Sequence, residues 1–392
     1  MNESVEQPTP AEVGERLRLA REEAKITQAD AASAIDVART TLVAVEQGQR
    51  RPRMNELQKL ARLYKTSVNA LLRQEAVYVD LSPRFRKLAT SKEGAADEAV
   101  QLLADLAKAE VELENLLGIK RVRNYPPERP IMPGDVRAQA EQDALELRQR
   151  LGLGLAPISD IVTLLEMELG VRVFVRRFNA KISGLFVYDD AIGACMLLNA
   201  NHPRERRSQT AGHETGHLTS TRREPEILQF DKIDNSREER YAHAFGRALF
   251  TPPRAVMQKF REITAGASKL TRRHVIILAH FFGVSREAMV RRLEELDLTK
   301  VGTWDWFVGN GGITNEQARQ VLGDLAMPDA QKTEADRPTS LRLNLLAAEV
   351  YERGLLSEGQ LARLLRLTRI ELREILEGVE LETDSDGITS LG

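Results

Sequence analysis

Cysteine is almost absent from this sequence, since Cys195 is the single one among 392 residues. A disulfide within the chain is therefore excluded, and so is a zinc site built on several cysteines. Any bound metal must be held by histidine and carboxylate side chains, and the chain has six histidines.

Long apolar runs are absent as well. No run approaches the roughly 20 residues that a membrane-spanning helix needs. The first thirty residues are polar and charged and contain no apolar signal core. We therefore expect a cytoplasmic protein without membrane contact. The formal net charge of −2 neither favours nor excludes nucleic acid, because a basic patch can be local.

The length of 392 residues predicts two to three domains rather than one core. Four prolines between Asn124 and Pro133 interrupt helical structure and predict a domain boundary there. The segments that we expect are a compact helical unit at 12–73, a connecting amphipathic helix at 84–123, a mixed domain at 135–300 and a helical C-terminal module at 339–380.

The fold predicted from the residue pattern is mainly α with a small β-sheet, an α+β fold. Alternating apolar residues predict three short strands, around 171–175, 185–187 and 196–198, with a turn at Asp189-Asp190 and Gly193. Helical periodicity predicts helices at 135–151 and 157–169, and helical structure from Arg204 to about residue 300.

The N-terminal unit contains about five predicted short helices. Thr27 can cap the second helix, with Asp30 three positions later, and a tight turn at Asp36-Val37 leads to the third helix. Two short helices joined by a tight turn inside a small bundle form a helix-turn-helix unit. The unit resembles the XRE family of phage-repressor-like helix-turn-helix domains at Leu17, Arg21, Thr27-Gln28, Ala31-Ala32, Ile35, Val45-Glu46-Gln47-Gly48, Arg51-Pro52 and Leu60-Ala61.

This resemblance implies that the third helix enters the major groove of double-stranded operator DNA. Its exposed first residues are Ala38, Arg39, Thr40 and Thr41, of which Arg39 can bind a guanine in a bidentate manner. The side chains placed for phosphates are Gln28, Arg50, Arg51 and Arg53. A small bundle that binds only protein is the alternative. The amphipathic helix that follows either pairs two copies into a homodimer or is buried against its own chain.

The segment His213-Glu214-Thr215-Gly216-His217 has the HExxH pattern. Residues four apart lie on one face of a helix, so His213 and His217 can hold one metal ion while Glu214 faces the attacking water. Two histidines on a helix face that make ordinary hydrogen bonds are the alternative. A third ligand is expected from the helix predicted at 237–251, where Glu239, Ala242, Phe245 and Leu249 follow helical spacing.

The region around this motif resembles the ImmA/IrrE metallopeptidase family over about residues 135–300. The matching residues are Leu169-Gly170-Val171, Ser183-Gly184-Leu185, Asn199 to Pro203, Arg206-Arg207, Glu239, Ala242, Phe245, Leu249 to Pro252, Phe281 to Ser285 and Arg292-Leu293. The resemblance implies Zn²⁺ held by His213, His217 and Glu239, with Glu214 as general base. It also implies a repressor or other regulatory protein as the substrate.

The sequence departs from the family pattern at His243, at Gly246 and at the polar segment Leu218 to Thr221. His243 lies four residues after Glu239, and it either assists at the site or is a buried hydrogen-bonding histidine. Cys195 is expected in the core, and Tyr241 is expected either in the core or at the surface rather than as an oxyanion donor. His202, His274 and His280 are expected to be structural or solvated.

Residues 339–378 contain a second possible helix-turn-helix, in which Ser357 and Thr368 can cap two short helices. Many small helical modules share such a pattern, so packing against the peptidase-like domain or self-association is favoured over nucleic-acid contact. Trp304, Trp306 and Phe307 are expected at the edge of a core.

The function favoured by these features is a DNA-binding transcriptional regulator with a zinc-dependent endopeptidase domain that cuts a partner protein. The alternative is a non-catalytic transcription factor, or an antitoxin-like autoregulator, whose peptidase-like fold senses a ligand or binds a partner. A third possibility is a stand-alone protease whose helix-turn-helix unit binds only protein.

Overall fold

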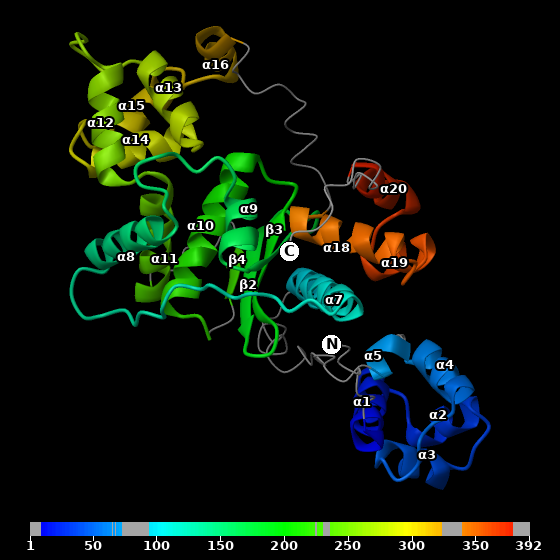
Figure 1. Cartoon of the computed structure of the whole chain (residues 1–392). Helices are drawn as coiled ribbons and strands as arrows, with labels where there is room; N and C mark the ends of the chain where they lie inside the picture. The colour runs from blue at the N-terminus through cyan, green and yellow to red at the C-terminus, as the bar shows by residue number, and fades with distance from the viewer. Residues whose placement is uncertain are drawn as a thin grey trace, which may run out of the picture.

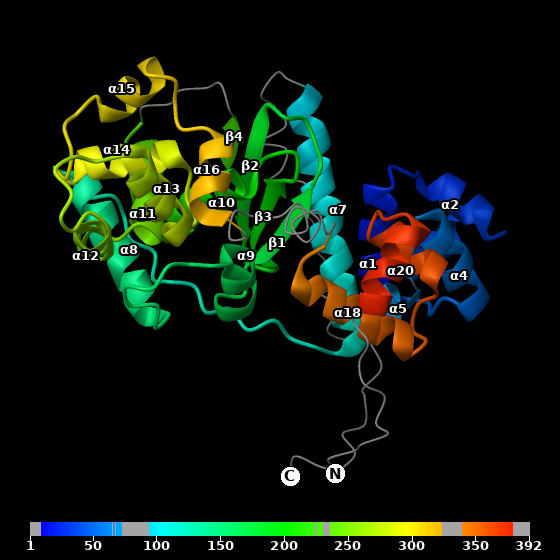
Figure 2. The same ribbon diagram turned by 90° about the horizontal axis from the view of Figure 1, so that it is seen from above.

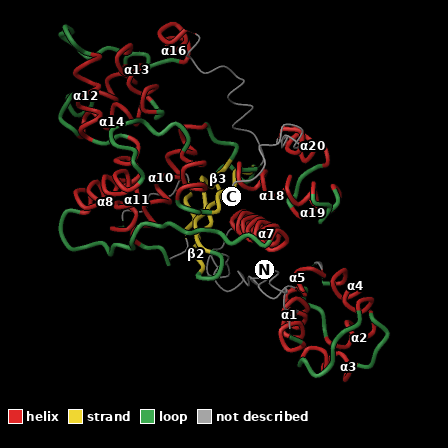
Figure 3. The backbone as a smooth tube through the Cα atoms, viewed as in Figure 1, coloured by secondary structure: helices red, strands yellow, loops and turns green. Residues whose placement is uncertain are grey.

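The computed structural model describes residues 9–64, 66, 68–72, 94–223, 226–229, 236–323 and 339–378. Helices predominate in these residues and surround one small sheet (Figures 1 and 3). The fold is thus mainly α with a small β-sheet, as predicted. No described helix has both the length and the apolar character needed to cross a membrane.

The N-terminal unit consists of short helices that bury their own apolar core (Figure 1). Thr9 and Thr27 cap the first two helices through their side-chain oxygens, which accept the amides of Glu12 and Asp30. The prediction of about five short helices in this unit is confirmed. They are α1 (Pro10–Glu23), α2 (Gln28–Ala34), α3 (Arg39–Glu46), α4 (Met54–Leu63) and α5 (Val68–Leu72).

The sheet has four strands in the order β1-β3-β2-β4. They are β1 (Arg172–Arg176), β2 (Ile182–Asp189), β3 (Gly193–Asn199) and β4 (Glu226–Gln229). Strand β1 is parallel to β3, and the other pairs are antiparallel. The three predicted strands are confirmed, but the expectation of helix throughout the region after Arg204 is wrong at β4. Four residues are too few to show an alternating pattern, and β4 is defined by its pairing with the distant β2.

Each face of the sheet is covered by helices, which explains why every residue of β3 is buried. Leu185, Val187 and Leu197 face helix α7 (Gly94–Leu117), while Phe186, Met196 and Leu198 belong to the core on the other face. That second core includes helices α10 (Arg204–Ser220) and α11 (Arg237–Phe250). Successive strand residues point to opposite faces, so α7 and α10 are separated by the sheet (Figure 2).

Helix α7 is more than the connecting helix that the sequence predicted. Its apolar residues share one buried cluster with the sheet and with the C-terminal helices α18 (Leu341–Glu352), α19 (Glu358–Leu364) and α20 (Arg369–Gly378). Residues 84–93 of the predicted helix lie outside the described residues. The C-terminal helices therefore pack against the sheet domain, the arrangement favoured from the sequence.

The remaining described helices belong to the regions before and after the sheet and α11. The helix predicted at 157–169 is instead a short α9 (Ile161–Thr163) that continues as a π-helix, η1 (Leu164–Glu168). Phe307 is buried, but Trp306 is 58% exposed, so the expected core position of Trp306 is wrong. The remaining helices are α8 (Val136–Arg150), α12 (Pro253–Ile263), α13 (Arg272–Phe282), α14 (Arg286–Glu295), α15 (Thr303–Gly309) and α16 (Asn315–Leu322).

Candidate metal centre

The centre is formed where α10 and α11 pack against each other at very short range. A Cβ atom on Gly216 would lie 2.8 Å from the Cα of Ala242, and one on Gly246 would lie 2.8 Å from the amide nitrogen of His213. Only glycine permits this approach, because such distances are shorter than real Cβ contacts. The departure at Gly246 is thereby explained, since α11 must lie this close for Glu239 to reach the histidines.

The two histidines of the HExxH segment lie on the same face of α10, with their Nε2 atoms 3.1 Å apart. Glu239, in the first turn of α11, places Oε1 3.2 Å from His217 Nε2 and Oε2 3.5 Å from His213 Nε2. Two ligand atoms that are each about 2.1 Å from a tetrahedral zinc ion lie about 3.4 Å apart. The nitrogen and oxygen atoms of His213, His217 and Glu239 are thus spaced as such an ion requires.

Burial keeps the imidazole of His213 in the form that binds metals. Burial lowers the pKa of His213 well below its usual range, and the neighbouring imidazoles of His217 and His243 lower it further. A neutral imidazole has the free lone pair that a metal needs. Within the described part of the chain, Glu239 has only imidazoles as ion-pair partners. Among the described residues, no lysine or arginine therefore satisfies the charge of this carboxylate.

Thr221 orients one of the imidazoles. Its Oγ1 lies 2.9 Å from His217 Nδ1. A hydrogen bond donated by Nδ1 leaves the lone pair of Nε2 directed at Glu239 and His213. The sequence had marked Leu218 to Thr221 only as unusually polar, and the role of Thr221 was missed. A threonine four residues after the second histidine, on the same helix face, was the available signal.

His243 lies at the edge of the centre. Its ring centroid is 4.5 Å from that of His213, and its Nε2 is 3.7 Å from Glu239 Oε2. The side chain is 54% exposed, so His243 is not the buried histidine of the alternative interpretation. His213, Glu239 and His243 also form a group that can hold a metal, with ligand atoms within 4.8 Å of one another. The shorter distances favour His217 over His243 as the third member.

Glu214 is fully buried directly after His213 on α10. It lies beside strand β2, where a Cβ atom on Gly184 would be 3.6 Å from its Oε1. The sheet thus forms one wall around this carboxylate.

Two family models match the chain. A helix-turn-helix domain model matches residues 12–74, and the peptidase M78 model, described as the IrrE N-terminal-like domain, matches residues 166–294. The chain therefore joins an XRE-like helix-turn-helix domain to an IrrE-like domain. The match from 166 to 294 includes every residue of the metal centre. This combination is that of a DNA-binding regulator with a peptidase-like domain.

No curated protein matches the chain. Among solved structures, the crystal structure of ComR from Streptococcus suis is 11% identical and is aligned over 94% of each chain, with a TM-score of 0.16. That score is too low to support a comparison of folds.

The helix-turn-helix domain presents the first turn of α3 to solvent. Ala38, Arg39 and Thr40 are exposed, and Thr41 is half-buried. Arg39 donates to Gln28 Oε1 over 3.3 Å, and Gln28 donates to Glu46 Oε2 over 2.9 Å. The half-buried Gln28 thus holds Arg39 at the surface of α3.

The loop after α3 contains Arg50, Arg51 and Arg53, and only some of these side chains are available to bind DNA. Arg50 donates to Glu56 over 2.8 Å, which connects this predicted phosphate ligand to α4. Arg51 and Arg53 are exposed. Their guanidinium groups are therefore the more accessible ones in this loop.

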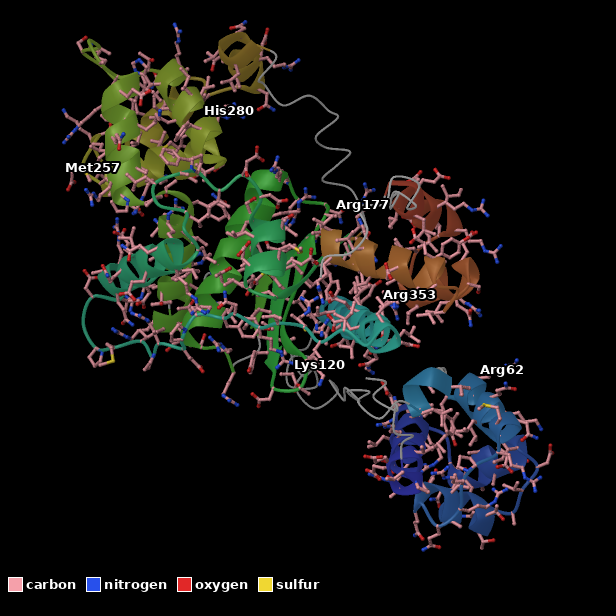
Figure 4. All side chains as sticks on the ribbon, in the orientation of Figure 1. Arg62, Lys120, Arg177, Met257, His280 and Arg353 are labelled. Carbon is pink, nitrogen blue, oxygen red and sulfur yellow. The ribbon has the colours of Figure 1, made fainter. Side chains whose placement is uncertain are left out.

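Other residues singled out in the sequence have structural roles in the IrrE-like domain. Tyr241 is buried and donates to Asp143 on α8 over 2.7 Å. His202 Nε2 lies 2.9 Å from the carbonyl oxygen of Ala180, and His274 caps α13. Burial raises the pKa of the Cys195 thiol to about 12, so it is not a nucleophile. His280 is exposed on α13, away from the metal centre (Figure 4).

Proposed function

We propose that this DNA-binding regulator is a zinc-dependent endopeptidase that hydrolyses a peptide bond in a partner regulatory protein of the repressor type. The observation that carries the proposal is the convergence of His213, His217 and Glu239, with pairwise ligand-atom distances of 3.1 to 3.5 Å. The donors fit zinc, because two imidazoles and one carboxylate leave a fourth position open for substrate.

Zinc bound there would supply a Lewis acid that polarises a carbonyl and acidifies water. Glu214 takes the proton of the attacking water and returns it to the leaving amine. Its burial beside β2 limits competing water. His243, at the exposed edge of the centre, is placed to donate a hydrogen bond to the oxyanion that develops on the substrate.

The helix-turn-helix domain binds double-stranded operator DNA. In this proposal Arg39 reads a guanine, while Ala38, Thr40 and Thr41 contact neighbouring bases. Gln28, Arg50 and Arg51 contact phosphates, and this binding weakens as salt rises. Two copies of the chain would read two half-sites as a homodimer.

The peptidase activity is tested with Glu214→Gln in the full chain. We expect the variant to retain zinc and bind its partner, while cleavage slows by about 10²- to 10⁴-fold, the usual contribution of a general base. Partner protein retained by this variant is then identified and incubated with the wild type. Glu205→Gln, on the same helix and half-buried, is the matched control and should cleave normally.

Two outcomes would overturn the peptidase proposal. One is equal processing of the partner by the wild type and by Glu214→Gln. The other is a wild-type protein that binds partner and operator but is unaffected by zinc removal. The second result would support the non-catalytic regulator instead.

DNA binding is tested with Arg39→Ala. Operator affinity should fall about tenfold, since a bidentate contact to guanine is lost. Arg62→Ala is the control, because Arg62 lies on α4 away from α3 in Figure 4. Equal affinities of Arg39→Ala and the wild type would favour a helix-turn-helix unit that binds only protein.

A further inference from the structure

The C-terminal helices α18, α19 and α20 repeat the backbone plan of α1, α2 and α3. The turn between α2 and α3 contains Asp36 at φ 57°, and the turn between α19 and α20 contains Arg366 at φ 51°. Positive φ is uncommon for residues other than glycine. Its recurrence at the same place between two short helices indicates the same tight turn.

The hydrogen bonds of the two turns also correspond, with equivalent residues 330 positions apart. Asp36 N donates to Ser33 O, and Val37 N donates to Ala32 O. Likewise, Arg366 N donates to Arg363 O, and Leu367 N donates to Ala362 O. The agreement therefore extends through the whole turn.

The same spacing holds for the helix caps and the buried positions. Thr27 accepts the amide of Asp30, and Ser357 forms a capping box with Gln360. The buried residues correspond one by one: Ala31 with Leu361, Ala32 with Ala362, Ile35 with Leu365, Leu42 with Leu372 and Val45 with Ile375. The two helix pairs thus bury the same set of positions.

The preceding helix follows the plan with one insertion. Lys25, at φ 56°, ends the turn after α1, and Gly354, at φ 63°, occupies that place after α18. The connection to the next helix is one residue longer at the C-terminus, where Leu355 and Leu356 replace Ile26. The repeated plan therefore covers three helices, the core of a helix-turn-helix domain.

The second unit is anchored to the IrrE-like domain. Arg176 of β1 donates to the carbonyl oxygen of Leu365 over 2.9 Å, and Arg366 pairs with Asp105 of α7. Apolar residues of α18 and α20 share the cluster formed by α7 and the sheet. These contacts hold one side of the unit on the sheet face opposite α10.

The other side of α20 is open to solvent. Arg369, Ile370 and Arg373 are exposed at the positions that correspond to Arg39, Thr40 and Val43 of α3. Residues 357–378 contain four arginines and four glutamates, whereas residues 27–48 contain one arginine and three acidic residues. The second helix pair therefore has no net charge, whereas the first has a net charge of −2, so the second is the less acidic of the two.

We infer that α19 and α20 form a second DNA-binding helix-turn-helix, with α20 entering the major groove of a duplex. Arg369 and Arg373 contact guanine edges or phosphates, and Ile370 contacts a thymine methyl group. The inference rests on the proposed DNA-binding function but adds a second site, on the side of the chain where Figure 4 labels Arg353. Among the described residues of α20, Ile370 is the one large apolar side chain that is exposed. A surface with a single exposed apolar side chain favours DNA over a protein partner.

In the experiment, the full chain selects duplexes from a library of random sequences. Each duplex is about 40 base pairs long, which is enough for two half-sites. Four proteins are compared: the wild type, Arg39→Ala, Arg369→Ala with Arg373→Ala, and the control Arg254→Ala with Arg261→Ala on the exposed face of α12. Arg373 pairs with Glu358 at the surface, and such pairs contribute little to stability. Zinc content and circular dichroism check that each variant is folded.

We expect the wild type to enrich a sequence with two elements. The α20 double variant should lose one element and bind the wild-type sequence about tenfold more weakly, with a smaller salt dependence, while Arg39→Ala loses the other element. The inference is overturned if the α20 double variant selects the same sequence with the same affinity as the control. It is also overturned if that variant loses only self-association, which would identify α20 as a protein-docking face. A wild type that enriches no sequence overturns both this inference and the proposed operator binding.

Discussion

Two buried clusters of charged residues lie on opposite faces of the sheet, and they differ in how the acidic charge is balanced. On the α7 face, Arg172 binds Glu110 over 3.0 Å and Glu114 over 2.7 Å. Arg121 and Arg342 also contact Glu114, each over 3.0 Å. On the α10 face, Glu239 meets only imidazoles among its described ion-pair partners.

The arginine cluster is electrostatically complete. Burial alone would raise the pKa of Glu114, but Arg172 and the other guanidinium groups hold that pKa at about 2. The cluster therefore needs no ligand, and it joins α7, β1 and α18. The centre around Glu239 combines a buried acid with imidazoles, and no lysine or arginine among the described residues pairs with that acid. This difference between the two clusters supports the proposal that the centre around Glu239 is a site for an external cation.

The largest effect on stability is expected from Arg172→Met. The substitution removes one ion-pair partner from each of the buried carboxylates Glu110 and Glu114, so the free energy of unfolding should fall by about 3–5 kcal/mol. Urea unfolding measures this loss, and zinc content should stay unchanged. Arg18→Met, which removes exposed ion pairs, should cost less than about 1 kcal/mol. An equal loss of unfolding free energy in both variants would show that the buried ion pairs contribute no more to stability than the exposed ones.

Zinc removal is the next largest perturbation. At a free zinc concentration of about 100 times Kd, the metal contributes about 2.7 kcal/mol to folding, and a chelator should remove this contribution. Thermal unfolding with and without chelator measures it. Operator affinity should not change, because the helix-turn-helix domain has its own core. A chelator that leaves the melting temperature unchanged would contradict the comparison, since the Glu239 cluster would then be complete without a metal.

Sequence reasoning succeeded where the chemistry is local. Helical period alone placed His213 and His217 on one face, and Glu239 followed from the family resemblance. Thr221, β4 and the arginine cluster were missed, because each depends on partners that the fold brings together. Arg172 and Glu114, for example, are 58 residues apart. The repeated turn at Asp36 and Arg366 was suggested by helix caps but became specific only through the backbone angles.

A smaller effect is expected from Thr221→Val. Loss of the hydrogen-bond partner of His217 Nδ1 should weaken zinc affinity about 10- to 100-fold, as is usual for residues that orient a ligand. Competition with a zinc indicator measures the affinity. Thr219→Val is the matched control, because the Thr219 hydroxyl donates to the carbonyl oxygen of Thr215 on the same helix. Equal affinities in the two variants would mean that Thr221 does not position His217.

The smallest effect concerns Glu166, which accepts the amide of Arg342 at the start of α18. Burial, with a smaller contribution from Glu110, raises the pKa of Glu166 from 4.5 to about 7, although Ser340, Arg342 and Arg121 oppose the shift. The folded state therefore binds the extra proton, and this stabilisation is lost as the pH rises from about 4.5 through 7. Glu166→Gln should raise the melting temperature by a few degrees at pH 8 and by little at pH 4.5. The same increase at both pH values would exclude titration of Glu166 as the cause.

The most direct test of the metal centre is zinc analysis with X-ray absorption spectroscopy of the purified full chain. The account predicts one zinc per chain, bound by nitrogen and oxygen neighbours at about 2.0–2.1 Å with imidazole scattering, and loss of this signal in His217→Ala. Protein without zinc after purification in zinc-containing buffer, or a sulfur neighbour at about 2.3 Å, would contradict it.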